Sequence, residues 1–235
     1  MTQPRHAASV QPFMRTLVAL AAALFAVSAF ADARVTHNFT SSMPLGSVRR
    51  VVIDIDAGDI KVRNGAAGTV TVTGRVRRET DDDDHVRDQR IVDDSTAAIY
   101  LSRDEAVVRR KFGPNAQGWR AQTHNMQWDV TIEVPAGVSV DVGTHYGDVA
   151  LDGTFGNIDV DLRAGDIDLT TPRAAVRELT ASVRIGEVHT HLGDEIIERE
   201  GVFPGKTHWI NKAATGTSIV NIHATAGDVS VVLTR

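Results

Sequence analysis

The chain contains no cysteine among its 235 residues. Disulfide bonds, thiolate catalysis, cysteine-ligated zinc and a lipid anchor attached to cysteine are therefore all excluded. Aromatic residues account for only 5% of the sequence, whereas valine, threonine, glycine and aspartate are plentiful. This composition is typical of a strand-rich protein with many tight turns.

Signatures of catalysis are also missing. Neither Ser182 nor Ser218 lies in a G-x-S-x-G elbow, and the sequence has no H-E-x-x-H, no G-x-x-x-x-G-K-[ST] and no dinucleotide-binding fingerprint. The glycine-rich nonapeptide by which some solenoids bind calcium is absent as well. We therefore predict that the protein is not an enzyme and that it uses no cofactor.

Acidic residues outnumber basic ones, with 30 Asp and Glu against 25 Lys and Arg. The formal net charge is −5, and it falls to −7 once residues 1–31, which hold two arginines and no acid, are removed. An acidic chain without a cluster of lysine and arginine is a poor ligand for nucleic acid or for an anionic membrane surface. We predict that it binds neither.

Residues 1–31 have the features of a signal peptide. Arg5 and Arg15 precede a short apolar run at 17–27, and Ala29-Phe30-Ala31 is an A-x-A cleavage signature. The run is too short for a spanning helix, and no later stretch could cross a bilayer. We predict export to the periplasm, the cell surface or the extracellular space, with an uncleaved N-terminal anchor as the alternative.

What the sequence has instead is a repeat centred on a glycine followed by an acid. The five copies of this turn are Gly58-Asp59, Gly147-Asp148, Gly165-Asp166, Gly186-Glu187 and Gly227-Asp228. Every side chain seven, five and three residues before the glycine, and two and four residues after it, is apolar or threonine. From Gly147 onward the glycines follow one another at intervals of 18, 21 and 41 residues, which indicates coils of about 20 residues.

This spacing predicts stacked strands. Alternation places the five apolar positions on one face of their strands, and one coil alone cannot enclose that face, so neighbouring coils must stack. The glycine allows a positive φ at the turn, where the acid faces water. We predict an all-β fold, a single-chain β-solenoid that is right-handed and β-helix-like, with Gly-Asp turns.

Three segments are expected to depart from the repeat. Residues 32–47 form an N-terminal segment that pairs loosely at the edge of the solenoid domain, residues 48–235. Within that domain, residues 79–128 form an irregular excursion, including the acidic run at 81–84 and one or two helical turns between 85 and 94. Residues 205–210 read as a degraded coil.

The run Val134-Pro135-Ala136-Gly137-Val138-Ser139-Val140, followed by the Gly-Asp copies, also resembles a known family. It is similar to the bacterial exported β-strand-repeat proteins labelled as adhesins, which are adhesin-like domains of unknown function. The resemblance covers roughly residues 47 to 235. It implies a β-solenoid and an adhesin-like role, and it brings no catalytic residues.

One column of polar side chains is a candidate site. His189 and His191 lie three and five residues after their glycine, and Asp168 and Asp152 are expected in the two preceding coils. Two imidazoles with a carboxylate suit zinc or nickel, or general acid–base chemistry. The simpler interpretation, which we favour, is an exposed polar ladder with no metal bound.

A second column contains Asp141, Asp159 and Asp161, which stacking could bring together. Carboxylate oxygens suit calcium, but a solvated acidic face is the interpretation that we favour. Among the tryptophans, Trp128 and Trp209 are predicted to point inward, while Trp119 in a loop is a candidate for stacking on a sugar.

These observations favour a non-enzymatic, exported β-solenoid that binds or scaffolds another component of the bacterial cell envelope. The partner is expected to be an unknown envelope component or a surface glycan, and the oligomeric state is left open. The alternatives are a small carbohydrate-active enzyme, or a metal-binding envelope protein, that uses the acidic and histidine-bearing strand face.

Overall fold

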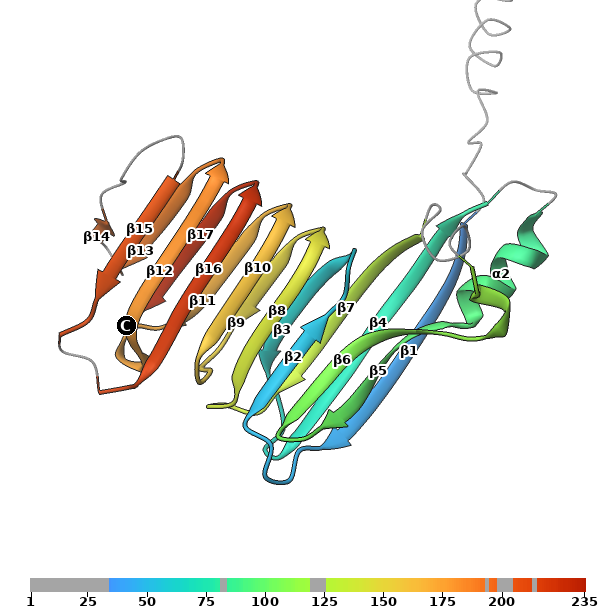
Figure 1. The fold of residues 1–235 in the computed structure, drawn as a ribbon, viewed down its shortest axis with the longest axis horizontal. Coiled ribbons are helices and arrows are strands. Elements are labelled where there is room, and N and C mark those ends of the chain that lie inside the picture. The colour runs from blue at the N-terminus through green and yellow to red at the C-terminus, as the bar shows by residue number, and fades with distance from the viewer. Residues whose placement is uncertain (1–33, 81–83, 119–125, 193–194, 198–204, 213–214) are drawn as a thin grey trace, which may run out of the picture.

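We analysed a computed structural model, which describes residues 34–80, 84–118, 126–192, 195–197, 205–212 and 215–235. These residues form an elongated all-β molecule in which two mixed sheets lie face to face (Figure 1). The one α-helix in the described part, α2 (His85–Asp93), lies at the N-terminal end of the stack.

The strands of the two sheets do not follow the order of the sequence. The order in sheet A is β1 (Arg34–Pro44), β4 (Thr69–Glu79), β7 (Met126–Val134), β3 (Asp59–Asn64), β9 (Val149–Asp152), β11 (Ile167–Pro172), β17 (Val229–Thr234), β13 (Val188–Leu192) and β14 (Glu195–Ile197). The order in sheet B is β15 (Gly205–Ile210), β12 (Val176–Ile185), β16 (Ser218–Ala226), β10 (Ile158–Ala164), β8 (Ser139–Tyr146), β2 (Arg50–Asp54), β6 (Glu105–Phe112) and β5 (Ser95–Ser102).

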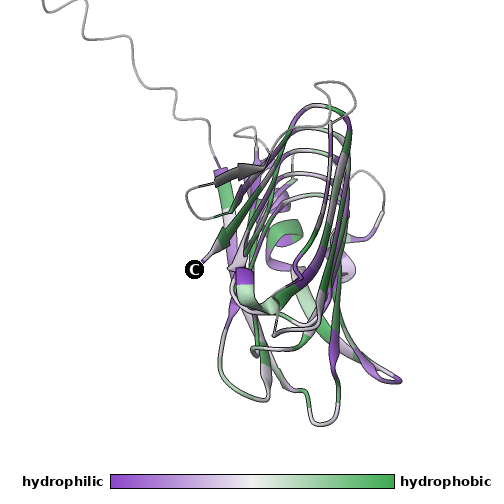
Figure 2. Cartoon of the chain, turned by 90° about the vertical axis from the view of Figure 1, so that its left-hand side faces the viewer, coloured by the Kyte–Doolittle hydropathy of each residue, from purple (hydrophilic) through white to green (hydrophobic). Residues whose placement is uncertain are grey.

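Stacked coils make up the middle of the molecule. Each coil gives one strand to sheet B and the next to sheet A, and neighbouring coils pair in parallel in both sheets. Every side chain at the five apolar positions of the five copies is buried, including Thr144 and Thr190. Figure 2, which looks along the stack, shows the coils as superposed flattened loops. The predicted stacking is confirmed, while the handedness of the winding stays a prediction.

The coils are not stacked in the order in which they occur in the chain. Coil β16–β17 comes last in the sequence, yet it pairs with β10–β11 on one side and with β12–β13 on the other. Coil β12–β13 therefore lies outside it. Strand β15, which we expected to be a degraded coil, pairs antiparallel with β12 and caps sheet B instead.

The glycines of the repeat form a continuous corner. All five have positive φ, between 115° and 141°, as the turn requires. Their second role was not predicted: a Cβ on Gly165 would lie 2.2 Å from the carbonyl oxygen of Gly147, and one on Gly227 would lie 1.8 Å from that of Gly165. Because backbones touch here, even alanine would clash.

The acids that follow the glycines are also ordered. The Asp148 amide donates to the Asp59 carboxylate (3.2 Å), the Asp166 amide to Asp148 (3.0 Å), the Asp228 amide to Asp166 (2.8 Å) and the Glu187 amide to Asp228 (2.9 Å). Each carboxylate thus binds the backbone of the next coil. These acids do not merely face water, because they tie the corners together.

The N-terminal part is more regular than expected. Strand β1 pairs with β4 along all of its 11 residues, so the segment before residue 48 is not loosely held. Strand β6, from the predicted excursion, and strand β7, which begins where that excursion ends, form a further coil that pairs in parallel with β2–β3. Trp128 occupies the place of the corner glycine in this coil and packs against Gly58.

Helix α2, between 85 and 93, agrees with the predicted helical turns and is fixed to the sheet by a buried ion pair. The guanidinium of Arg78 on β4 lies 3.3 Å from the carboxylate of Asp88, and both side chains are almost fully buried. Trp128 is buried as predicted, and its ring contacts Phe39 and Phe112. Side-chain contacts, rather than a repeated turn, hold this end together.

Several predictions fall outside the described residues. The signal peptide, the first three residues of the acidic run and Trp119 are among them. Within the described part of the chain, no helix is long and apolar enough to cross a membrane.

Candidate functional site

The predicted column of Asp152, Asp168, His189 and His191 does not converge. Asp168 and His189 both pair with Ser230, so one whole strand separates them, about 9.6 Å at ordinary strand spacing. The physical reason is the inserted coil β16–β17, which occupies the place that the sequence order assigns to β12–β13.

Asp152 and His191, the other two residues of the predicted column, are separated further. Asp152 pairs with Thr170, Thr170 with Val232, and Val232 with His191, so two strands lie between Asp152 and His191. The Nε2 atom of His189 instead lies 3.1 Å from a carboxylate oxygen of Glu187. Across the described residues, no group of three or more His, Asp or Glu side chains could hold a metal ion.

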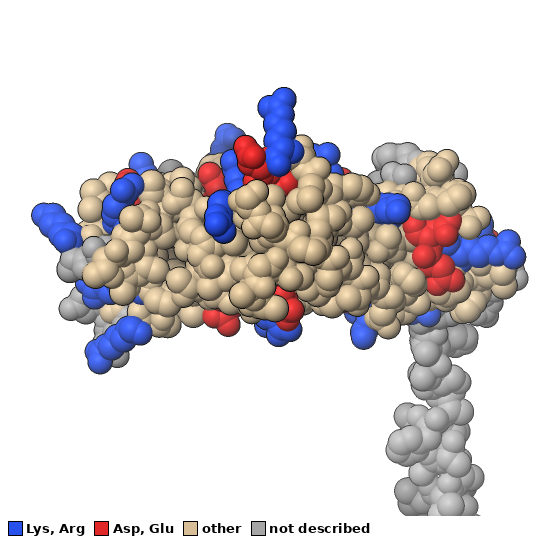
Figure 3. All heavy atoms as spheres, turned by 90° about the horizontal axis from the view of Figure 1, so that it is seen from below, with Lys and Arg blue, Asp and Glu red and all other residues tan. Residues whose placement is uncertain are grey.

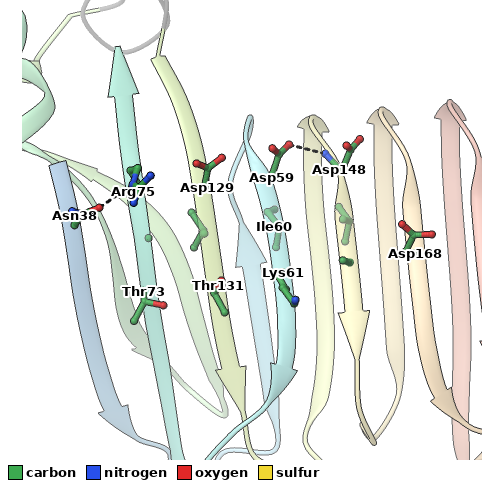
Figure 4. A pocket seen from close by; sticks show the side chains of 14 residues that line it. Asn38, Asp59, Ile60, Lys61, Thr73, Arg75, Asp129, Thr131, Asp148 and Asp168 are labelled. Atoms are coloured by element: carbon green, nitrogen blue, oxygen red, sulfur yellow. Dashed lines mark hydrogen bonds between the residues drawn. The ribbon is translucent and has the colours of Figure 1, made fainter. Parts of the chain in front are cut away.

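A concavity lies on the outer face of sheet A. It is a groove of about 540 Å³ that crosses β1, β4, β7, β3, β9 and β11, and we call it the sheet A groove (Figure 4). Its polar lining consists of Asn38, Asp59, Lys61, Thr73, Arg75, Asp129, Thr131, Asp148 and Asp168. Only Asp168 comes from the predicted column.

A row of carboxylates forms the upper side of this groove. Strand pairing places Arg75 beside Asp129 and Asp129 beside Asp59, and Asp148 continues the row (Figure 4). Arg77 holds Asp129 at 2.9 Å, and Arg75 donates to the amide oxygen of Asn38 at 3.1 Å. The carboxylates are therefore fixed before any ligand arrives.

Lys61 and Thr131 lie two residues further along their strands than Asp59 and Asp129, on the same face of the sheet (Figure 4). The groove thus offers oxygen acceptors, hydroxyl groups and an ammonium group on a rigid sheet, with backbone amides already paired in the ladder. Such a surface suits a ligand with many hydroxyl or amine groups, because such groups donate to carboxylates.

A second groove, of about 470 Å³, lies on the opposite face; we call it the sheet B groove. At its centre, Arg50 on β2 binds the Asp141 carboxylate on β8 and lies 3.3 Å from Glu105 on β6. Asp159 on β10 is directly opposite Asp141 in the parallel register. Asn221, on β16, completes the row beside Asp159.

The surroundings of Arg50 and Asp159 shift the pKa values of both groups in the sheet B groove. The hydrogen bond to Asp141 raises the pKa of Arg50 above its ordinary value. Partial desolvation, followed by repulsion from Asp141 and Asp161, raises the pKa of Asp159, although Arg50 and a hydrogen bond from Asn221 oppose this rise. One carboxylate is paired with a cation, while the pKa of its neighbour is raised.

Sequence reasoning found part of this second site. It singled out Asp141, Asp159 and Asp161 as one acidic face, and the register places them on adjacent strands. It missed Arg50, which is 91 residues from Asp141 and gives no local signal. Trp209, predicted to point inward, is half-buried against the core and packs on Arg173.

Lysine and arginine do not gather into one patch on the face seen in Figure 3, where both signs of charge are scattered in small groups. This face gives no basic footprint of the kind by which proteins bind nucleic acid.

Comparison with known proteins identifies a family. A family model described as Toastrack DUF4097 matches residues 45–232, which is most of the chain. No curated protein matches the sequence.

Several solved structures show a distant likeness. A candidate cell adhesion protein from Clostridium sporogenes ATCC 15579 is 9% identical with a TM-score of 0.49, over 85% of this chain and 100% of that one. A candidate adhesin from Bacteroides fragilis NCTC 9343 is 8% identical with a TM-score of 0.26, over 84% and 97%. A candidate lipid-binding protein from Parabacteroides distasonis ATCC 8503 is 7% identical with a TM-score of 0.22, over 85% and 97%. At such values the likeness carries no argument about function.

Proposed function

The chain belongs to the Toastrack DUF4097 family, and from this premise we propose that it is a non-enzymatic, adhesin-like binding or scaffolding protein of the bacterial cell envelope. Export by the predicted signal peptide would take it to the periplasm, the cell surface or the extracellular space. The ligand that we propose is a surface glycan bound in the sheet A groove.

One observation carries this proposal: the groove presents carboxylates that are held rigidly by neighbouring strands. Asp129 is fixed by Arg77, and Asp59 accepts the amide of Asp148. Sugar hydroxyls donate readily to such carboxylates, and a preorganised surface loses little entropy when it binds them. Extended grooves on stacked coils are also a common binding surface of solenoid proteins.

The test of the site is binding of the labelled protein to an array of immobilised bacterial surface polysaccharides. We expect the double variant Asp59→Asn/Asp129→Asn to lose at least about tenfold in affinity, since each charge-assisted hydrogen bond contributes about 1.5 kcal/mol or more. The matched control is Asp161→Asn, which removes an exposed acid from the opposite sheet and should leave binding unchanged. Equal binding by all three proteins would exclude the sheet A groove.

The test of the location is independent of the ligand. A C-terminally tagged chain expressed in a bacterium should be found outside the cytoplasm and shortened by about 31 residues, as the cleavage signature predicts. A full-length tagged chain that stays in the cytoplasm would contradict export.

A specific observation favours a second candidate, a carbohydrate-active enzyme that uses the sheet B groove. Glycosidases pair an ionised carboxylate with a carboxyl group of raised pKa. Asp141, which is bound to Arg50, and Asp159, whose pKa is raised, form such a pair on adjacent strands. Release of reducing ends from an array polysaccharide by the wild type, and its loss in Asp159→Asn, would support this candidate over simple binding.

A further inference from the structure

The C-terminal coil fills a slot that the preceding chain leaves open. Strands β10 and β12 pair with β16 and not with each other, and β11 and β13 likewise pair with β17. Without residues 218–234, two pairs of parallel strand edges would lie about 9.6 Å apart, which is the width of one coil.

The closing coil, residues 218–234, fits this slot along its whole length. Strand β16 pairs with six residues of β10 and eight of β12, and β17 pairs with six of β11 and five of β13. Its inward side chains, which are among the most fully buried of the protein, are Val220, Ile222, Ala224, Val229, Val231 and Leu233. An open slot would expose these apolar partners and unpaired strand edges, so it must be filled.

The contacts that hold the closing coil come from the two coils beside it, β10–β11 and β12–β13. The registers and buried contacts depend only on the sequences that meet, so a closing coil from another molecule would make the same interactions.

We propose that this slot is an acceptor site for the closing coil of a second copy of the chain, which yields a dimer with exchanged C-terminal coils. Each slot then holds residues 218–234 of the other copy. Such exchange is a low-cost route to a dimer, because it reuses an interface that already exists within the monomer. The inference rests on topology and does not depend on the proposed glycan ligand.

The absence of cysteine permits a clean test with the full chain. Asp161 on β10 pairs with His223 on β16, and both side chains are exposed. Adjacent paired strands lie within the Cα–Cα range that a disulfide requires. A tagged Asp161→Cys variant and an untagged His223→Cys variant would be unfolded together, refolded at increasing protein concentration and then oxidised.

We expect a disulfide-linked heterodimer whose yield rises about tenfold for each tenfold increase in protein concentration, until it saturates near the millimolar effective concentration of a tethered coil. The mismatched control combines Asp161→Cys with Ser230→Cys, which lies on the same coil but in sheet A. This pair should give only background cross-linking, as should matched variants that are mixed after folding.

Two further measurements keep the outcome decisive. The double variant Asp161→Cys/His223→Cys, refolded at high dilution, should close its disulfide within one chain, which shows that the pair can form. The wild type refolded at high concentration should show a dimer mass by light scattering. Matched heterodimer at the background level, or a wild type that remains monomeric at every concentration, would overturn the proposal.

Discussion

The stack from β8 to β17 and the N-terminal part from β1 to β7 reach the same two-sheet architecture by different means. In the stack, coils meet through equivalent positions: glycine lies on glycine, and each acid binds the next coil's amide. In the N-terminal part, β1, β4 and β7 pair antiparallel, and arginine–carboxylate pairs join neighbouring strands.

This difference shows what sets strand register in each region. Where the sequence repeats, close backbone contact at the corner aligns one coil on the next. Where the partner strand lies outside the repeat, as β7 does, cross-strand pairs such as Arg63–Glu133, at 2.6 Å, and Arg77–Asp129 support the alignment. The stack should therefore be sensitive to added atoms at its corner, and the N-terminal part to lost charges.

The largest effect is expected from Gly165→Ala. The new Cβ would lie 2.2 Å from the Gly147 carbonyl oxygen, in a residue whose φ is +137°. Backbone on both sides cannot move without opening the stack, so the free energy of unfolding should fall by about 4 kcal/mol or more. Urea denaturation would measure the loss, and failure to fold would be its extreme form.

Gly137→Ala separates crowding from backbone strain. Gly137 also has a positive φ, +79°, but a Cβ there would meet nothing within 4 Å. Its substitution should cost only about 1–2 kcal/mol, the usual penalty of a left-handed residue. Equal losses at the two glycines would show that the corner is not limited by space.

The next largest effect is expected in the N-terminal part, from Asp88→Ala. This change removes the carboxylate that lies 3.3 Å from the buried guanidinium of Arg78. Loss of one partner of a buried ion pair costs about 3 kcal/mol. Amide hydrogen exchange should show α2 losing protection while β10 and β16 keep theirs.

The control for Asp88 lies on the same helix. Asp93 is exposed and contacts His37 at 3.6 Å, so Asp93→Ala should cost no more than about 0.5 kcal/mol. If Asp88→Ala instead lowered protection equally in both regions, the helix would not be a separable part of the fold.

The same contrast explains how much of the structure could be predicted. The five apolar positions around each glycine were all correctly assigned to the core, because alternation and turn chemistry are local. The order of the coils could not be obtained in this way. Every copy presents the same apolar positions, so nothing local decides whether β12–β13 or β16–β17 lies beside β10–β11.

The coil β6–β7 escaped prediction for a related reason. Trp128 replaces the corner glycine, and residues 113–125 separate the two strands, so the fixed spacing is lost. The candidate site was predicted least well, because each groove is lined by residues from several coils and the order of those coils could not be predicted. Asp168 was found, whereas Asp129, Arg75 and Arg50 were not, since no repeat position marks them.

The smallest effect concerns the junction of the two regions, where Arg50 of β2 lies beside Asp141 and Asp159 of the stack. Partial desolvation and neighbouring carboxylates raise the pKa of Asp159 above its ordinary value of 3.8 in the folded protein. The folded state then binds the proton more tightly than the unfolded state does. This contribution to stability is present below pH 3.8 and is lost as the pH rises through the folded pKa.

Asp159→Asn should therefore unfold at slightly higher urea concentration than the wild type at neutral pH, and the difference should vanish in acid. Since Asp159 is exposed, solvent screening limits the gain to about 0.5 kcal/mol or less. Arg50 lowers the same pKa, so the gain should grow in an Arg50→Gln background. A gain that is independent of pH, or unchanged by Arg50→Gln, would mean that this arginine does not relieve charge repulsion where the two regions meet.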